Sequence, residues 1–259
     1  MVWGDYLANS AEEAGAGRSR TVTVGWTLHG ERSNLIYSPP RAFDRGAPKP
    51  ASAKSVQVCP AAVDFDRRHF VVTCPYDLTL KIDRTPDGKL SLQDADGMQS
   101  AMRPAGSRNV LTLHPPAEWR HPERPIIQLA APWIFVADEV CYLVQTPPYL
   151  DYFPTPRPGV QIGGRFPVHV WPRPLSWGFE WHDISRPLVL KRGEPWFYVH
   201  FETENPAARV RLVEAERTGE LDEFVTSILD VTNYVNRTFS LFDEARRRRP
   251  EKLLRAKKE

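Results

Sequence analysis

The chain has 259 residues, of which 41% are hydrophobic and 25% are charged, so it can bury a sizeable core and is neither disordered nor fibrous. Its 25 prolines argue against a helical bundle, and its three cysteines, none in a close CxxC pair, indicate neither a disulfide framework nor a structural zinc site. The net charge of +2 is small, and no secretory signal or membrane-spanning apolar run is present, so we expect a cytoplasmic protein without a membrane span.

The first half of the chain reads as short strands. Residues 1–20 are polar and rich in Ala and Gly, which predicts a poorly ordered start. Residues 21–28 alternate as a half-buried strand does, and the four prolines of residues 38–54 predict an exposed connection. Residues 56–61 and 70–75 are β-rich stretches that each contain Cys-Pro, which suits strand margins because proline cannot donate to a ladder.

A β-hairpin is the clearest local signal. Residues 78–83 and 89–93 flank Pro86-Asp87-Gly88, a turn sequence that joins antiparallel strands. Further short strands are expected at residues 110–113, 126–129, 133–137 and 140–145.

Residues 158–204 hold four of the eight tryptophans and continue the pattern of strands and short turns. Strand after strand with few helices favours an antiparallel sandwich, jelly roll or barrel over a parallel α/β sheet. The strands of this segment are expected at residues 165–171, 177–182, 187–190 and 196–202.

The carboxyl end turns helical. Apolar residues recur at helical spacing over about 219–236, after Thr218 as a cap, and a second helical start is visible at 240–244. Residues 246–259 hold eight Lys or Arg against two Glu, which forms a basic tail. Such a tail can contact phosphate backbones weakly, or it can be a solvated, frayed end. Since no basic patch interleaved with aromatics occurs elsewhere, a nucleic-acid domain is not expected.

Histidines and a carboxylate on the predicted hairpins suggest a metal site. If the turn near Arg173 closes a hairpin, His169 lies opposite Glu180, while Glu180 and His182 share a strand face and His200 follows on the next strand. Imidazoles with a carboxylate are the ligand set of non-haem iron and of cupin-type sites, so His169, Glu180, His182 and His200 are the candidate metal ligands. The candidate cofactor is a divalent transition metal such as iron. The alternative is that these histidines are hydrogen-bonded within the sheet or lie on its wet face.

Aromatic side chains suggest a pocket in the same segment. Trp171, Trp177 and Trp181 are candidates to hold a planar or sugar-like ligand, with Arg173 to pair with a carboxylate. The alternative is a core built from large residues.

The segment 147–154 is aromatic and irregular, which suggests a lid over the pocket. Gly163-Gly164 lets a backbone approach a ligand, or forms a bend in a strand. The default for Cys74 is a buried, inert thiol.

Four short motifs occur in this order: Cys59-Pro60-Ala61, Cys74-Pro75-Tyr76-Asp77-Leu78, Trp171-Pro172-Arg173-Pro174-Leu175 and Arg192-Gly193-Glu194-Pro195. Over about residues 55–245 the chain therefore resembles a family of uncharacterised proteins of bacteria and tailed phages. The resemblance implies no activity.

These observations predict one mainly β domain over residues 21–245, of antiparallel jelly-roll, cupin-like or sandwich type, with a carboxyl-terminal amphipathic helix. The leading functional hypothesis is a small-molecule-binding or modifying protein, in its enzymatic form a metal-dependent oxygenase of an acidic small molecule. The competing hypothesis is a non-catalytic β-sandwich interaction module that uses an aromatic face and the basic tail. Homo-oligomerisation fits either hypothesis.

Overall fold

The computed structural model describes residues 20–30, 37–44, 55, 58–100, 110–151, 153, 155–231 and 238–258. The strands are β1 (Thr21–Leu28), β2 (Arg41–Ala42), β3 (His69–Thr73), β4 (Leu78–Arg84), β5 (Leu90–Asp94), β6 (Leu111–Leu113), β7 (Ile126–Val136), β8 (Cys141–Thr146), β9 (Gly159–Ile162), β10 (Gly164–Phe166), β11 (Pro174–Trp181), β12 (Leu188–Leu190), β13 (Pro195–Thr203) and β14 (Arg209–Glu214). The helices are α2 (Pro60–Arg67), α4 (Gly219–Val231) and α5 (Thr238–Arg248), with 3-10 turns η2 (Gly97–Gln99) and η3 (Pro116–Glu118).

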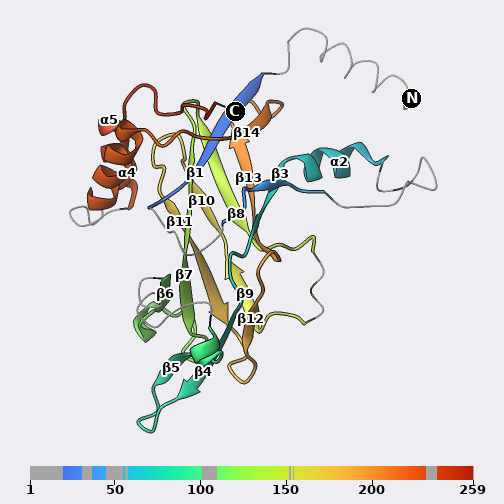
Figure 1. The fold of residues 1–259 in the computed structure, drawn as a ribbon, viewed down its shortest axis with the longest axis vertical. Coiled ribbons are helices and arrows are strands. Elements are labelled where there is room, and N and C mark those ends of the chain that lie inside the picture. The colour runs from blue at the N-terminus through green and yellow to red at the C-terminus, as the bar shows by residue number, and fades with distance from the viewer. Residues whose placement is uncertain are drawn as a thin grey trace.

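The described strands form three sheets (Figure 1). The largest has the order β14-β1-β7-β11-β9, with β6 also paired to β7. The second has the order β10-β8-β13-β3-β2, and β12-β4-β5 form the third, at the lower end of the molecule in Figure 1. The chain crosses from the largest sheet to the second between β9 and β10, at Gly163. Pairing is antiparallel except for β1 with β14, which run parallel.

The main core lies between the sheets, because each strand turns alternate apolar side chains inward. Tryptophans and phenylalanines fill it, and the fully buried rings pack edge to face and stacked. The largest of them are Trp133, Trp177, Trp181, Trp196, Phe135, Phe179 and Phe197. The protein is therefore a mainly β structure with one aromatic core shared by all three sheets.

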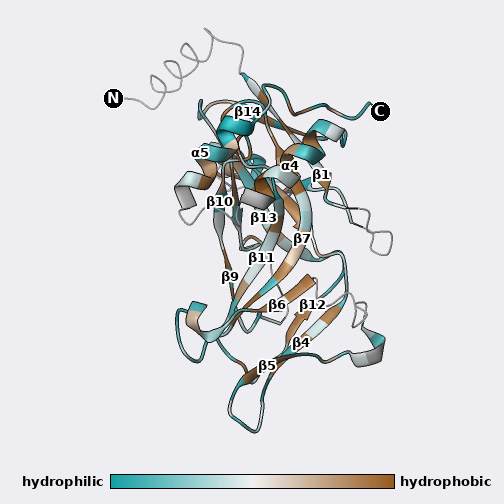
Figure 2. Ribbon diagram, turned by 90° about the vertical axis from the view of Figure 1, so that its left-hand side faces the viewer, coloured by the Kyte–Doolittle hydropathy of each residue, from teal (hydrophilic) through white to brown (hydrophobic). Residues whose placement is uncertain are grey.

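A second, smaller core lies on the outer face of the largest sheet. The outward residues Ile134 and Val136 of β7 contact apolar residues of α4, among them Leu221 and Phe224. Figure 2 shows α4 and α5 near the upper end, and apolar residues of both helices, such as Phe224 of α4 and Phe242 of α5, pack in this core. The described contacts of α4 and α5 with the largest sheet are thus with Ile134 and Val136, at the carboxyl end of β7.

Most predicted strands are confirmed, and the Pro86-Asp87-Gly88 turn joins β4 to β5 with Gly88 at φ 81°. Three of the strand predictions are wrong. Pro60 begins α2 where a strand was expected, since its fixed φ suits the first helical turn. The strand expected at 165–171 ends at Phe166, and β7 is one strand through Pro132 instead of two. Residues 1–19, 45–54 and 232–236, which belong to other predictions, lie outside the described residues.

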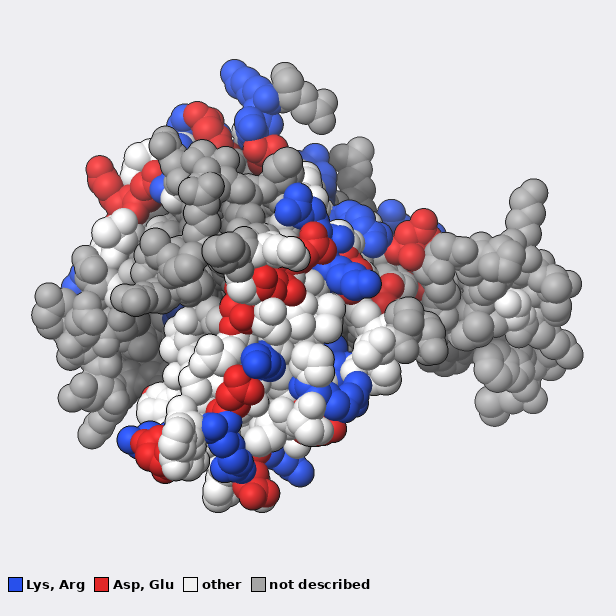
Figure 3. Space-filling view, turned by 60° about the horizontal axis from the view of Figure 1, so that its bottom comes forward, with Lys and Arg blue, Asp and Glu red and all other residues white. Residues whose placement is uncertain are grey.

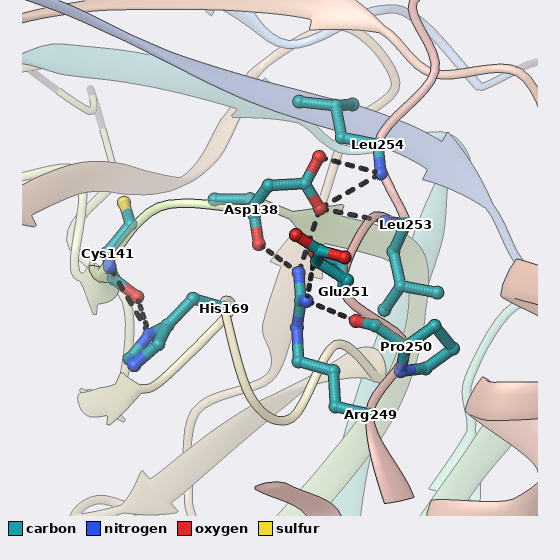
Figure 4. A network of polar contacts seen from close by, with 9 residues as sticks. Asp138, Cys141, His169, Arg249, Pro250, Glu251, Leu253 and Leu254 are labelled. Atoms are coloured by element: carbon teal, nitrogen blue, oxygen red, sulfur yellow. Dashed lines mark hydrogen bonds and ion pairs between the residues drawn. The ribbon is translucent and has the colours of Figure 1, made fainter.

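The tail predicted as basic and exposed packs against the body (Figure 4). Asp138, in the turn after β7, accepts a hydrogen bond from Arg249 at 2.8 Å and one from the amide of Leu253 at 2.8 Å. Leu253 is buried, and Ala256 forms a β-bridge with Ala215 after β14. The interpretation as a frayed end is therefore wrong, because the apolar pair Leu253-Leu254 and Asp138 hold the segment in place. Most of its basic side chains are exposed, as the interpretation as a solvated end predicts.

Acidic and basic side chains are interspersed over the face seen from below (Figure 3). Within the described part of the chain, no helix is long and apolar enough to cross a bilayer.

Candidate functional site

Two of the four candidate metal ligands lie together. Glu180 and His182 share a face of β11 and its continuation, with His182 Nε2 3.2 Å from Glu180 Oε1. Glu180 is also paired with Arg120 and lies 3.8 Å from the Arg124 guanidinium. The carboxylate is 3% exposed, so these cations offset the cost of burying its charge. Its partners make Glu180 an ion-pair centre.

The other two candidate ligands lie elsewhere. His169 is in the turn after β10, where its Nδ1 is 2.8 Å from the Cys141 carbonyl oxygen (Figure 4). His200, on β13, packs beside His69 with ring centroids 5.1 Å apart. Burial lowers the pKa of both His169 and His200.

Among the residues that the structure describes, no group of three or more His, Cys, Asp or Glu side chains could hold a metal ion. The predicted set of four ligands is therefore not assembled. Its physical reason is the end of β10 at Phe166: His169 lies in a turn, so it is not opposite Glu180 as a hairpin strand would place it.

The candidate aromatic residues are mostly core. Trp177 and Trp181 are fully buried between the sheets, as the alternative interpretation expected. Trp171 packs in the smaller core, edge to face with Phe242 of α5. Arg173 stays beside it, with its guanidinium 4.8 Å from the Trp171 ring, and burial lowers its pKa. These four residues do not line one cavity.

A cavity of about 270 Å³ opens where the chain crosses between the two sheets, and we call it the edge cavity. It lies on the part of the largest sheet that α4 and α5 leave uncovered. Its walls come from the connection before β7, from β7, β11 and β8, and from the β9–β10 crossing. The lining residues are His114, Glu118, Ile126, Gln128, Gln145, Ile162, Gly163, Gly164, Phe166, Ser176 and Gly178.

A histidine held between two side chains forms one end of the edge cavity. His114 Nδ1 lies 2.6 Å from Glu118 Oε2, and its Nε2 lies 3.2 Å from Gln128 Oε1. An ionised carboxylate only accepts, so His114 Nδ1 donates to Glu118. The tight turn η3 brings Glu118 back to His114, and the outward face of β7 presents Gln128. The imidazole is thus fixed in one orientation at the cavity.

The other end holds a buried glutamine. Gln145 of β8 donates from Nε2 to the Ser176 carbonyl at 3.2 Å, at a point on β11 that β9 does not reach. The Gln145 side chain thereby gives the Ser176 carbonyl a hydrogen-bond donor where β9 does not pair with β11. Gly163 keeps the crossing close, since a Cβ there would lie 3.0 Å from the Gln145 carbonyl oxygen. Gly178 has no side chain at the floor of the cavity, and the nearest atoms to a Cβ built there are those of Ile162, at 3.5 Å and beyond.

Sequence reasoning missed most of this cavity. His114 and Glu118 are four positions apart, but no strand or helix pattern around Pro115-Pro116 predicts the turn that joins them. Gln128 and Gln145 are single polar residues in apolar strands, which is the sequence signal that points to the cavity. Gly163-Gly164 was noted, and it lies at the cavity as one of its two interpretations suggested.

The buried thiols provide no chemistry here. Burial raises the pKa of Cys74 and of Cys141 to about 12, so both stay protonated near neutral pH.

No family model, no curated protein and no solved structure matches this chain.

Proposed function

We propose that this protein binds a small polyhydroxylated molecule, of monosaccharide or cyclic polyol size, in the edge cavity. The observation that supports it is the convergence of Gln128, Gln145, Ser176 and the His114–Glu118 pair on one cavity of about 270 Å³. A few fixed polar groups in a concave, partly apolar site are the usual form of a small-molecule site.

The kind of polar group favours hydroxyls on the ligand. Amides and a serine hydroxyl both donate and accept, as sugar hydroxyls do. None of the described residues lining the cavity is Lys or Arg, and Glu118 adds a carboxylate, so the lining does not favour an acidic ligand. A neutral polyhydroxylated ligand therefore takes the place of the acidic small molecule that the sequence suggested. Phe166 and Ile162 supply an apolar wall for the C–H face of a ring.

The alternative, an interaction module, is less well supported. It needs an exposed aromatic face, and Trp177, Phe179 and Trp181 are fully buried. It also needs a free basic tail, and Arg249 and Lys257 are paired with Asp138 and Glu214.

As to fold type, we propose a jelly-roll-like sandwich, supported by the two sheets around one core, although the parallel pairing of β1 with β14 departs from a fully antiparallel order.

The test is binding of D-glucose, D-galactose, D-mannose and myo-inositol, measured by ligand-observed NMR and calorimetry. We expect at least one to bind the wild type. Gln128→Leu should weaken that binding roughly tenfold, since it removes a hydrogen-bonding group from the site. Gly178→Ala should weaken it by adding a methyl group to the floor.

Gln93→Leu is the matched control, because Gln93 is an exposed glutamine on β5, outside the cavity. It should bind as the wild type does. No binding of the four compounds at millimolar concentration, or equal binding by Gln128→Leu and wild type, would overturn the proposal.

A further inference from the structure

A second cavity, of about 280 Å³, is walled by the proline-rich connection from β8 to β9 and by β12 with the turn that follows it. We call it the arginine cavity. It is distinct from the edge cavity, since the two share no lining residue. Its lining residues are Phe153, Thr155, Pro156, Arg157, Pro158, Pro187, Val189, Lys191 and Glu194.

Arg157 is a partly buried cation without an ion-pair partner. Its two terminal nitrogens donate to backbone carbonyls, to that of Pro195 at 3.0 Å and to that of Trp196 at 3.3 Å. Among the residues that the structure describes, no carboxylate forms an ion pair with this guanidinium. A charge that is partly removed from water is costly unless an opposite charge pairs with it. The two carbonyls thus hold the guanidinium in place and leave its charge uncompensated.

One edge of the guanidinium remains accessible. Within the described part of the chain, Arg157 Nε has no hydrogen-bond partner, and it is not one of the fully buried nitrogens that lack one, so it keeps contact with solvent. The corresponding Nε of Arg249 is fully buried. The guanidinium of Arg157 lies 4.7 Å from the ring centre of Phe153, and both residues line the arginine cavity. A planar guanidinium in this position can donate to a carboxylate in the cavity.

The charged groups of the lining favour an anion. Lys191 adds a second cation, and Glu194 is the one carboxylate among the described lining residues. Burial lowers the pKa of Arg157 by more than Cys74 and Glu194 together raise it, so Glu194 does not offset the burial of this charge. Arg157 also lines a neighbouring cavity under the connection, but the other charged residue there is Asp151, which repels anions. An anionic ligand therefore belongs in the arginine cavity.

The remaining walls are apolar. The ring of Phe153 and three prolines form one part of them, and Val189 of the edge strand β12, which is 39% exposed, forms another. Flat apolar walls beside a cation suit a small organic acid with a ring as its body. Phe153 belongs to the segment 147–154, which the sequence suggested as a lid over a pocket.

We infer that the arginine cavity binds a small monocarboxylate with a flat apolar body, of the size of benzoate, whose carboxylate pairs with Arg157 and Lys191. The carboxylate compensates the charge that the backbone carbonyls leave unbalanced. Hydrogen bonds between charged groups are about twice as strong as neutral ones, so the carboxylate determines which compounds bind. The ring covers the apolar wall and removes it from water.

The test uses benzoate as the probe, with methyl benzoate as the matched neutral compound. Ligand-observed NMR and calorimetry should show benzoate binding the wild type roughly tenfold more tightly than the ester. Arg157→Lys keeps the charge but removes the planar fork, so it should weaken benzoate binding roughly tenfold. Lys191→Gln should weaken it roughly threefold, because an exposed cation contributes less. Arg192→Gln is the matched control: Arg192 is the next residue of the same turn but does not line the cavity, so this variant should bind benzoate as the wild type does.

Stability gives a second, independent readout. Benzoate at millimolar concentration should raise the urea midpoint of the wild type more than that of Arg157→Lys, because a ligand stabilises the folded state only where it binds. Gln128→Leu, in the edge cavity, should bind benzoate as the wild type does, so the two sites are tested separately. If Arg157→Lys does not fold, Lys191→Gln takes its place in both measurements. Absent benzoate binding, equal binding of benzoate and its methyl ester, or benzoate binding by the cavity variants equal to that of the wild type would each overturn the inference.

Discussion

Gly159 and Gly178 lie on neighbouring strands, and each position requires the absence of a side chain for a different reason. Gly159, on β9, lies so close to β11 that a Cβ would be 2.0 Å from the Glu180 carbonyl oxygen. Gly178, on β11, has room for a Cβ and instead keeps the edge cavity open. The first glycine is a packing requirement of the sheet, and the second is a requirement of the cavity.

Gly159→Ala should therefore lower the free energy of unfolding by about 3 kcal/mol or more, since the clash is with backbone that cannot rotate away. Gly178→Ala is the matched control and should change it by less than about 1 kcal/mol, because extended backbone suits alanine. Urea denaturation of both variants measures the difference. Equal stability of the two would contradict the packing argument.

At the scale of elements, the carboxyl-terminal segment acts as an additional strand-like piece of the body. Asp138 is its anchor, because one carboxylate accepts from the Arg249 guanidinium and from the amides of Leu253 and Leu254. Gly25 of β1 makes room for it, since a Cβ there would lie 2.3 Å from the Leu254 side chain. Hydrogen bonds and packing together fix the segment.

Asp138→Ala should release this segment and cost about 2–4 kcal/mol, because it leaves a largely buried guanidinium and backbone amides without their acceptor. Limited trypsin digestion should then cut at Lys252 and Arg255 faster than in the wild type, where the backbone of this segment is held by hydrogen bonds. The control is Asp243→Ala, whose carboxylate makes an exposed ion pair with Arg246 and should matter little. Unchanged digestion of the Asp138 variant would refute the anchoring role.

At the scale of the whole molecule, stability should depend on pH through two half-buried histidines in different places, His169 and His200. Burial lowers the pKa of both His169 and His200, and the neighbouring His69 lowers that of His200 further, with Arg68 acting in the same direction and Glu202 against it. For both histidines the largest cause is burial, which disfavours the charged imidazole. As pH falls below about 6.5, the unfolded chain takes up protons that the folded protein resists.

The free energy of unfolding should thus fall as pH drops from about 6.5 toward the lowered pKa values. Above about pH 6.5 both histidines are neutral in either state, so they should add no pH dependence. His200→Leu should flatten this dependence, since the residue no longer titrates in either state. Urea denaturation at a series of pH values measures the slope. A variant slope equal to that of the wild type would show that His200 does not contribute.

Local pattern alone determined a large part of the fold. The alternation of Thr21–Leu28, the Pro-Asp-Gly hairpin and the helical spacing after Gly219 each encode their own element, because side-chain period and turn chemistry act within a few residues. The mainly β class follows from their sum. The face shared by Glu180 and His182 was also predictable, since side chains repeat every two residues on a strand.

Tertiary structure decided the sites. Whether His169 lies opposite Glu180, and whether Trp177 faces a ligand or the core, depend on which strands pair and where the chain changes sheets. The same holds for the docking of a tail that carries eight basic residues, which an acceptor more than a hundred positions away determines. Homo-oligomerisation stays a prediction. Long-range pairing sets these outcomes because a cavity is the space that packed elements leave, and no single segment encodes that space.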